Sequence, residues 1–86
     1  NWTKVLMDRV GARMNGLSLH YYTVTGWSGS KGSATQFNTE DYYWTMGKCR
    51  EIEDVIKKHC AIMDQYDPQK NVALILDEWG TCAMLL

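Results

Sequence analysis

The sequence predicts an α/β fold, a parallel βαβ unit with one helix before it. Two stretches, residues 17–24 and 71–77, have the composition of strands, and a helical pattern fills residues 38–66 between them. A strand, a helical crossover and a second strand of similar character form a parallel pair, almost always right-handed. Because such a pair cannot close its own sheet, we expect further strands on both sides. A barrel and an open doubly wound sheet both meet that requirement.

The first helix is expected over residues 3–14, where Leu6 and Val10 recur at helical spacing and Asn15–Gly16 ends the pattern. The strand that follows, LSLHYYTV, is rich in β-branched and aromatic residues. The next stretch, TGWSGSKGSATQFN, reads as a long loop, and loops of that size are usually functional or disordered.

A single long helix is expected to begin at Asn38 or Thr39, either of which can cap it, and to end at Tyr66 before Asp67–Pro68. Gly47 is its weak point. Tyr42, Tyr43 and Trp44 are expected to pack this helix against its neighbours. Its buried face is expected to contain Met46, Cys49, Ile52, Ile56, Cys60 (or His59) and Met63.

The second strand, NVALILD, is apolar on both faces, as a strand buried in a parallel sheet must be. Barrels and open parallel sheets both bind their ligands at the C-terminal ends of their strands. Those ends carry HYYT and DEWG, and the long loop follows the first of them. Neither strand-to-helix turn contains GxGxxG, so dinucleotide binding is not favoured.

Size and charge exclude several classes of protein. A chain of 86 residues is at most one small domain, and its formal net charge of −1 leaves no basic patch for a nucleic-acid partner. The longest apolar run, VALIL, is far below the roughly 20 residues that span a membrane. No stretch resembles a signal peptide. Because the sequence begins with Asn1, we expect that it is cut from something longer.

The three cysteines do not predict a metal or cofactor site. Cys49, Cys60 and Cys82 form no CxxC pair. Eleven residues along one helix would separate Cys49 from Cys60 by roughly 16 Å, too far for a disulfide or a shared metal, and His59 points about 100° away from Cys60. Free thiols in a reducing compartment, with no cofactor, are therefore expected.

Glu78 is the first candidate for chemistry. A carboxylate at the C-terminal end of a strand, in an apolar setting, can act as a nucleophile or as an acid/base group. The alternative is that Asp77 and Glu78 only begin a loop or cap a helix. Alternation along a strand places these two residues on opposite faces, so they are not expected to form a catalytic pair.

His20 and Tyr22 share one face at the end of the first strand. If the two strands are neighbours, an imidazole or a phenol on this face can hydrogen-bond Glu78. The alternative is that Tyr22 is a packing residue and His20 a satisfied buried polar group. Trp27 and Trp79 can stack on the faces of sugars, although tryptophan is more often a core residue.

Four stretches, NGLSLHYYTV, KGSAT.F....YY, IMDQYDP and DEWGT, together resemble the family 51 glycoside hydrolases, the α-L-arabinofuranosidases. The resemblance covers residues 1 to about 81. It implies a fragment of a (β/α)8 TIM barrel, from strand six to strand seven, and a retaining mechanism in which Glu78 is the nucleophile. It also implies that Tyr22 hydrogen-bonds the nucleophile and that His20 helps to line the −1 subsite.

The same resemblance implies what the chain lacks. The family's acid/base glutamate lies on strand four, so residues 1–86 are expected to be a partial catalytic-barrel domain that is inactive alone. Cys82 and the letters AMLL stand where the family has a tryptophan and a long loop, which makes residues 82–86 an atypical tail.

The implied parent is a cytoplasmic enzyme, a homo-oligomer, that acts on the non-reducing ends of arabinose-containing carbohydrates. Two alternatives remain open. One is another retaining glycosidase of the same clan, and the other is a non-catalytic remnant or interaction fragment.

Overall fold

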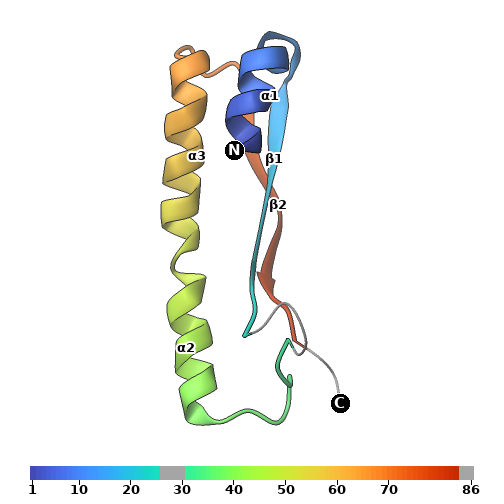
Figure 1. Ribbon diagram of the computed structural model, residues 1–86, viewed down its shortest axis with the longest axis vertical. Helices are drawn as coiled ribbons and strands as arrows, with labels where there is room; N and C mark the ends of the chain where they lie inside the picture. The colour runs from blue at the N-terminus through green and yellow to red at the C-terminus, as the bar shows by residue number, and fades with distance from the viewer. Residues whose placement is uncertain (26–30, 84–86) are drawn as a thin grey trace. The chain divides into compact units, whose positions relative to one another are not determined.

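The computed structural model describes residues 1–25 and 31–83 (Figure 1). Its elements are α1 (Trp2–Val10), a 3-10 turn (Gly11–Arg13), β1 (Gly16–Thr23), α2 (Thr39–Cys49), α3 (Ile52–Tyr66) and β2 (Ala73–Thr81). Over the described ranges, β1 and β2 form a two-stranded sheet. Helices and strands therefore alternate in the predicted order, and the α/β character of the fold is confirmed.

The two strands are parallel. The amide of Ala73, at the start of β2, donates a hydrogen bond to the carbonyl of Asn15, just before β1 (3.1 Å). Further along both strands, the hydroxyl of Ser18 donates to the Asp77 carboxylate at 2.6 Å. The partners advance in the same direction along the chain, which defines a parallel pair. A helical connection between parallel strands is the βαβ unit that the sequence predicts.

The chain divides into two compact units. The first contains Asn1–Leu19 and Glu53–Asp77, and the second contains the described residues of His20–Ile52 and Glu78–Leu86. The core of the first unit combines buried side chains from α1, β1, α3 and the residue just before β2: Met7, Leu17, Met63 and Val72. The burial of apolar surface therefore holds α1, β1, α3 and the segment that leads into β2 together.

The start of α1 is fixed by hydrogen bonds. The side chain of Asn1 accepts from the amide of Thr3 at 2.9 Å, which satisfies one of the amide groups that the first turn of a helix leaves without a partner. The hydroxyl of Thr3 is buried, and it lies 2.7 Å from Nδ1 of His59 on α3. A polar contact thus accompanies the apolar core of the first unit.

The single long helix expected from the sequence is two helices. Asn38 caps α2 by accepting from the amide of Asp41 at 2.7 Å, and α3 ends at Tyr66, both as predicted. Between them, the amides of Arg50 and Glu51 bond to carbonyls three residues earlier, which replaces the α-helical pattern by a tighter turn. The break therefore follows the predicted weak point, Gly47, by a few residues.

This break corrects two expectations. Cys49 and Cys60 lie on different helices, so the distance expected along one helix does not apply to them. The predicted buried face holds for Met63, but Met46 is 50% exposed, and α2 has no buried residue. The aromatic residues Tyr42, Tyr43 and Trp44 are also exposed, so the packing role expected of them is wrong for this chain by itself.

The turn between α3 and β2 is organised by one carboxylate. Oδ2 of Asp67 accepts from the amide of Val72 at 2.7 Å. This bond, and a further one from the amide of Asn71, stabilise the charged carboxylate and lower the pKa of Asp67 below its usual value. The Asp67–Pro68 signal therefore ends the helix as predicted and also holds the start of β2.

The second strand is longer and less buried than the sequence predicts. β2 extends from Ala73 to Thr81, so Asp77 and Glu78 lie inside it and not where it stops. Ile75 and Trp79 of this strand are 48% and 66% exposed. The expectation of a strand covered on both faces is therefore wrong for the described residues.

Candidate active site

The candidate site is in the second unit, where Glu78 lies beside two side chains of β1. The hydroxyl of Tyr22 donates a hydrogen bond to Oε2 of Glu78 at 3.3 Å. Nδ1 of His20 lies 3.3 Å from the same carboxylate oxygen. The expectation that His20 and Tyr22 reach Glu78 from one face of the first strand is confirmed.

The site is open to solvent, and the hydroxyl of Tyr22 stays protonated, so it can donate a hydrogen bond to the Glu78 carboxylate. The side chains of His20 and Glu78 are 50% and 52% exposed. The pKa of Tyr22 is raised above its usual value, first because desolvation disfavours the phenolate and then because of the negative charge of Glu78. Tyr22 is therefore a protonated donor at neutral pH.

Asp77 does not follow the alternation that the sequence predicts. Its carboxylate accepts from the hydroxyl of Ser18, whereas Glu78 meets His20 and Tyr22. Ser18, His20 and Tyr22 are alternate residues of β1 and belong to one of its faces. The expectation that Asp77 and Glu78 serve opposite faces is therefore wrong.

A shift in the strand register explains this departure. The carbonyl of Asn15 accepts from Ala73, 58 residues later, whereas the carbonyl of Thr23 accepts from Cys82, 59 residues later. Over this span β2 contains one residue more than β1, which is a bulge in the parallel pair. Gly80 has a φ of +124°, a conformation that side chains disfavour, and it lies within the span. With one extra residue in β2 over this span, strict alternation of side chains cannot hold along all of it.

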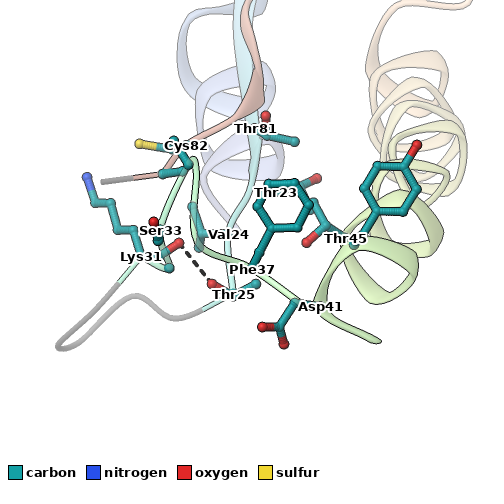
Figure 2. A pocket seen from close by; sticks show the side chains of 14 residues that line it. Thr23, Val24, Thr25, Lys31, Ser33, Phe37, Asp41, Thr45, Thr81 and Cys82 are labelled. Carbon is teal, nitrogen blue, oxygen red and sulfur yellow. Dashed lines mark hydrogen bonds between the residues drawn. The ribbon is translucent and has the colours of Figure 1, made fainter. Parts of the chain in front are cut away.

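A pocket of about 230 Å³ lies past the C-terminal ends of the two strands, within the second unit (Figure 2). The hydroxyl of Thr25 donates to the carbonyl of Lys31 at 2.8 Å, which links the end of the strand to the KGSAT stretch. Gly32, with a φ of +82°, allows the backbone to turn there. The lining residues are Thr23, Val24, Thr25, Lys31, Gly32, Ser33, Ala34, Phe37, Asp41, Tyr42, Thr45, Thr81, Cys82 and Ala83.

Two tryptophans were also expected to be able to stack on a sugar. Trp27 lies outside the described residues. Trp79 is exposed, next to Glu78 along β2. Among residues 1–25 and 31–83, no group of histidine, cysteine and carboxylate side chains is arranged to hold a metal ion. No helix in the same ranges is long and apolar enough to cross a membrane.

Sequence reasoning missed three residues that shape the site. Ser18 precedes His20 by two positions on the same face, which is a signal for a contact beside Glu78. Gly80 interrupts a strand pattern, and an isolated glycine in a strand often marks a bulge. The hydroxyl of Tyr21 donates to the carbonyl of Lys48 at 3.0 Å, and no local pattern indicates that contact.

Two known proteins are similar to the chain over most of its length. The chain is 80% identical over 80 residues, 93% of its length, to an intracellular exo-α-L-arabinofuranosidase of Bacteroides ovatus. Its structure matches the crystal structure of the GH51 arabinofuranosidase from Xanthomonas axonopodis pv. citri with a TM-score of 0.86, at 46% identity over 93% of the chain. The resemblance to the family 51 arabinofuranosidases is confirmed. No protein-family model matches the chain.

The similarity is to a part of each of these proteins. The chain spans 16% of the length of the Bacteroides enzyme and 16% of the Xanthomonas chain. Because the stretch similar to the Bacteroides enzyme covers 80 of the 86 residues, it includes Glu78 wherever it begins.

Proposed function

We propose that the chain is a segment of the catalytic domain of a retaining α-L-arabinofuranosidase, and that Glu78 is its nucleophile. The observation that carries the proposal is the position of Glu78 in a parallel strand, with Tyr22 and His20 both on one of its oxygens. The similarity to two arabinofuranosidases supports the choice of substrate.

In this proposal residues 1–86 are part of a (β/α)8 TIM barrel, with β1 as strand six and β2 as strand seven. The remaining strands and helices would cover the apolar surface that the chain exposes, including Ile75 and the aromatic side chains of α2. Residues 82–86 stay an atypical tail.

The mechanism has two displacements at the anomeric carbon of a terminal arabinofuranosyl unit. A carboxylate oxygen of Glu78 attacks this carbon, and the bond to the leaving-group oxygen breaks with its electron pair on that oxygen. The leaving oxygen takes a proton from a carboxylic acid that another strand of the enzyme supplies, about 5 Å from Glu78. Water, deprotonated by the same group, then releases arabinose and the free carboxylate.

The other site residues have supporting roles. Tyr22 orients the Glu78 carboxylate, His20 lines the −1 subsite, and Trp27 stacks on the sugar. The substrate is an arabinofuranosyl-containing carbohydrate, taken from its non-reducing end. The Bacteroides relative is named an intracellular enzyme, which supports a cytoplasmic location. We also propose that the whole enzyme is a homo-oligomer, with no nucleic-acid or membrane partner.

The test uses a chimera of the Bacteroides enzyme in which the similar 80-residue stretch is replaced by the matching residues of this chain. Hydrolysis of an aryl arabinofuranoside by the chimera is expected to continue. Glu78→Ala should abolish that activity, and added azide should partly restore it by taking the place of the carboxylate. Glu53→Ala is the matched control, because Glu53 is an exposed carboxylate on α3 that pairs with Lys57. Full activity in the Glu78→Ala chimera would overturn the nucleophile assignment.

A second test concerns the 86-residue chain alone, which we expect to be inactive. It supplies no general acid in the proposed mechanism, and general acid catalysis contributes typically 10²–10⁴-fold. An activated aryl arabinofuranoside needs little acid assistance, so it is the most permissive substrate for this test. Steady turnover that disappears in Glu78→Ala would show that the segment assembles a working site without the rest of the barrel.

A further inference from the structure

The two oxygens of the Glu78 carboxylate have different surroundings. Tyr22 and His20 both contact Oε2, at 3.3 Å each. Neither of these two contacts involves Oε1. Both contacts of the carboxylate described above are therefore on one of its two oxygens.

We propose that His20 is a positioning residue that donates from Nδ1 to one oxygen of Glu78, so that the opposite oxygen attacks the anomeric carbon. The proposal rests on the proposed function and adds a role for each carboxylate oxygen. His20 and Tyr22 then work together, because both act on the same atom. This role is more specific than lining the −1 subsite.

The proposed hydrogen bond sets where His20 carries a proton. A carboxylate oxygen only accepts hydrogen bonds, so a bond at this position requires a proton on Nδ1. Both the neutral Nδ1–H form and the imidazolium meet that requirement. The contact of 3.3 Å is at the long end for a hydrogen bond, and such contacts often tighten when substrate is bound.

The two donors act most strongly on the second chemical step. Attack by the free oxygen of Glu78 forms an ester at the anomeric carbon, and the held oxygen becomes the ester carbonyl. When water attacks the anomeric carbon, the bond to the ester oxygen breaks and its electron pair restores the carboxylate. Donors on the carbonyl oxygen stabilise this returning charge. In the first step the same donors stabilise the starting carboxylate, so their removal slows that step less.

The expected signature is a separation of kcat from kcat/KM. In the chimera, His20→Ala should lower kcat by about 10- to 100-fold, the size typical of a hydrogen bond to a charged group. KM should fall with kcat because the ester accumulates, and kcat/KM should change much less. With an aryl substrate, a burst of aryl alcohol should precede the steady rate.

Two conservative variants separate positioning from a general structural role. The amide nitrogen of His20→Asn occupies the place of Nδ1, and that of His20→Gln occupies the place of Nε2. His20→Asn should therefore recover kcat to within about 3-fold of the unchanged chimera, while His20→Gln should resemble His20→Ala. The double variant His20→Ala/Tyr22→Phe should be non-additive, because both donors serve one oxygen.

The deciding measurement is the structure of the chimera with its ester trapped by an aryl 2-deoxy-2-fluoro-arabinofuranoside. The carbonyl oxygen of the ester should contact Tyr22 and Nδ1 of His20, and the bonded oxygen should contact neither. The reverse arrangement, or equal kcat values for the Asn and Gln variants, would overturn the proposal. If Glu78→Ala retains activity, the proposed function fails instead; if only the His20 results disagree, the nucleophile assignment stands. The trapped structure needs no variant, so a misfolded variant does not prevent the test.

Discussion

Replacing Gly80 by alanine tests whether the register shift in β2 depends on that glycine. Among residues 1–25 and 31–83, a Cβ added at Gly80 would meet no atom within 4 Å, so no steric clash with them is expected. The cost comes from the backbone, because a φ of +124° is a conformation that only glycine adopts readily. Holding another residue in such a region costs of order 1–3 kcal/mol. The substitution should therefore destabilise the strand, or move it out of the bulge and displace Glu78.

The chain offers a matched control for this substitution. A Cβ added at Gly47 would also meet none of the described atoms within 4 Å, but Gly47 lies inside α2 and has no unusual φ. Gly47→Ala should stabilise the helix by about 0.5–1 kcal/mol, because alanine has the higher helix propensity.

The assay is urea denaturation of the two chimeric variants, combined with the rate of aryl arabinofuranoside hydrolysis. The denaturation midpoint should fall for Gly80→Ala and rise for Gly47→Ala, and only Gly80→Ala should lose activity. A Gly80→Ala variant as stable and active as the unchanged chimera would refute the reasoning, because the bulge would then not need glycine.

Three further predictions concern protonation and capping. Because the pKa of Tyr22 is raised in the folded state, the contribution of Tyr22 to stability is present below about pH 10 and is lost as the pH rises through the folded pKa. To measure this pKa, the phenolate absorbance of Tyr22→Phe is subtracted from that of the unchanged chimera at each pH. The difference should show a phenol that ionises above its ordinary pKa. The pKa of Asp67 is lowered in the folded state, so its contribution to stability is present above about pH 4 and is lost as the pH falls through the folded pKa. The denaturation midpoint of Asp67→Asn should therefore change less between neutral and acidic pH than that of the unchanged chimera. An equal change in both proteins would contradict this. Asn38→Ala removes the cap of α2 and should cost about 1 kcal/mol in denaturation experiments, with exposed Gln36→Ala as the neutral control.

The features that the sequence predicts correctly depend on short stretches of chain. Asn38 can cap a helix with its own side chain, and Asp67–Pro68 stops one, so both ends of the helical region were predictable. The shared face of His20 and Tyr22 follows from alternation along β1, so both could be expected to reach one residue of a neighbouring strand. The motif that carries the resemblance adds the chemistry, because spacing alone does not distinguish a nucleophile from a loop carboxylate.

The features that it misses depend on distant parts of the chain. The extra residue in β2 is visible only when its backbone pairing with β1 is known at both ends, so the common face of Asp77 and Glu78 was not predictable. The exposure of Met46 and Trp44 also has a non-local cause, because an apolar pattern predicts burial without saying which segment provides the cover. Sequence periodicity therefore predicts which residues favour burial, but not whether this chain itself covers them.

The break between α2 and α3 has a consequence for how the chain opens. The carbonyl of Lys48 accepts hydrogen bonds from the amide of Glu51 and the hydroxyl of Tyr21. This carbonyl at the end of α2 therefore has hydrogen-bond partners that do not belong to α3. A helix interrupted in this way no longer transmits unfolding from one half to the other as a single cooperative element. In hydrogen–deuterium exchange, the amides of α2, which has no buried residue, should exchange earlier than those of α3, which contains buried Met63. Local opening can then loosen the unit that holds Glu78 while the apolar core around Met63 stays intact.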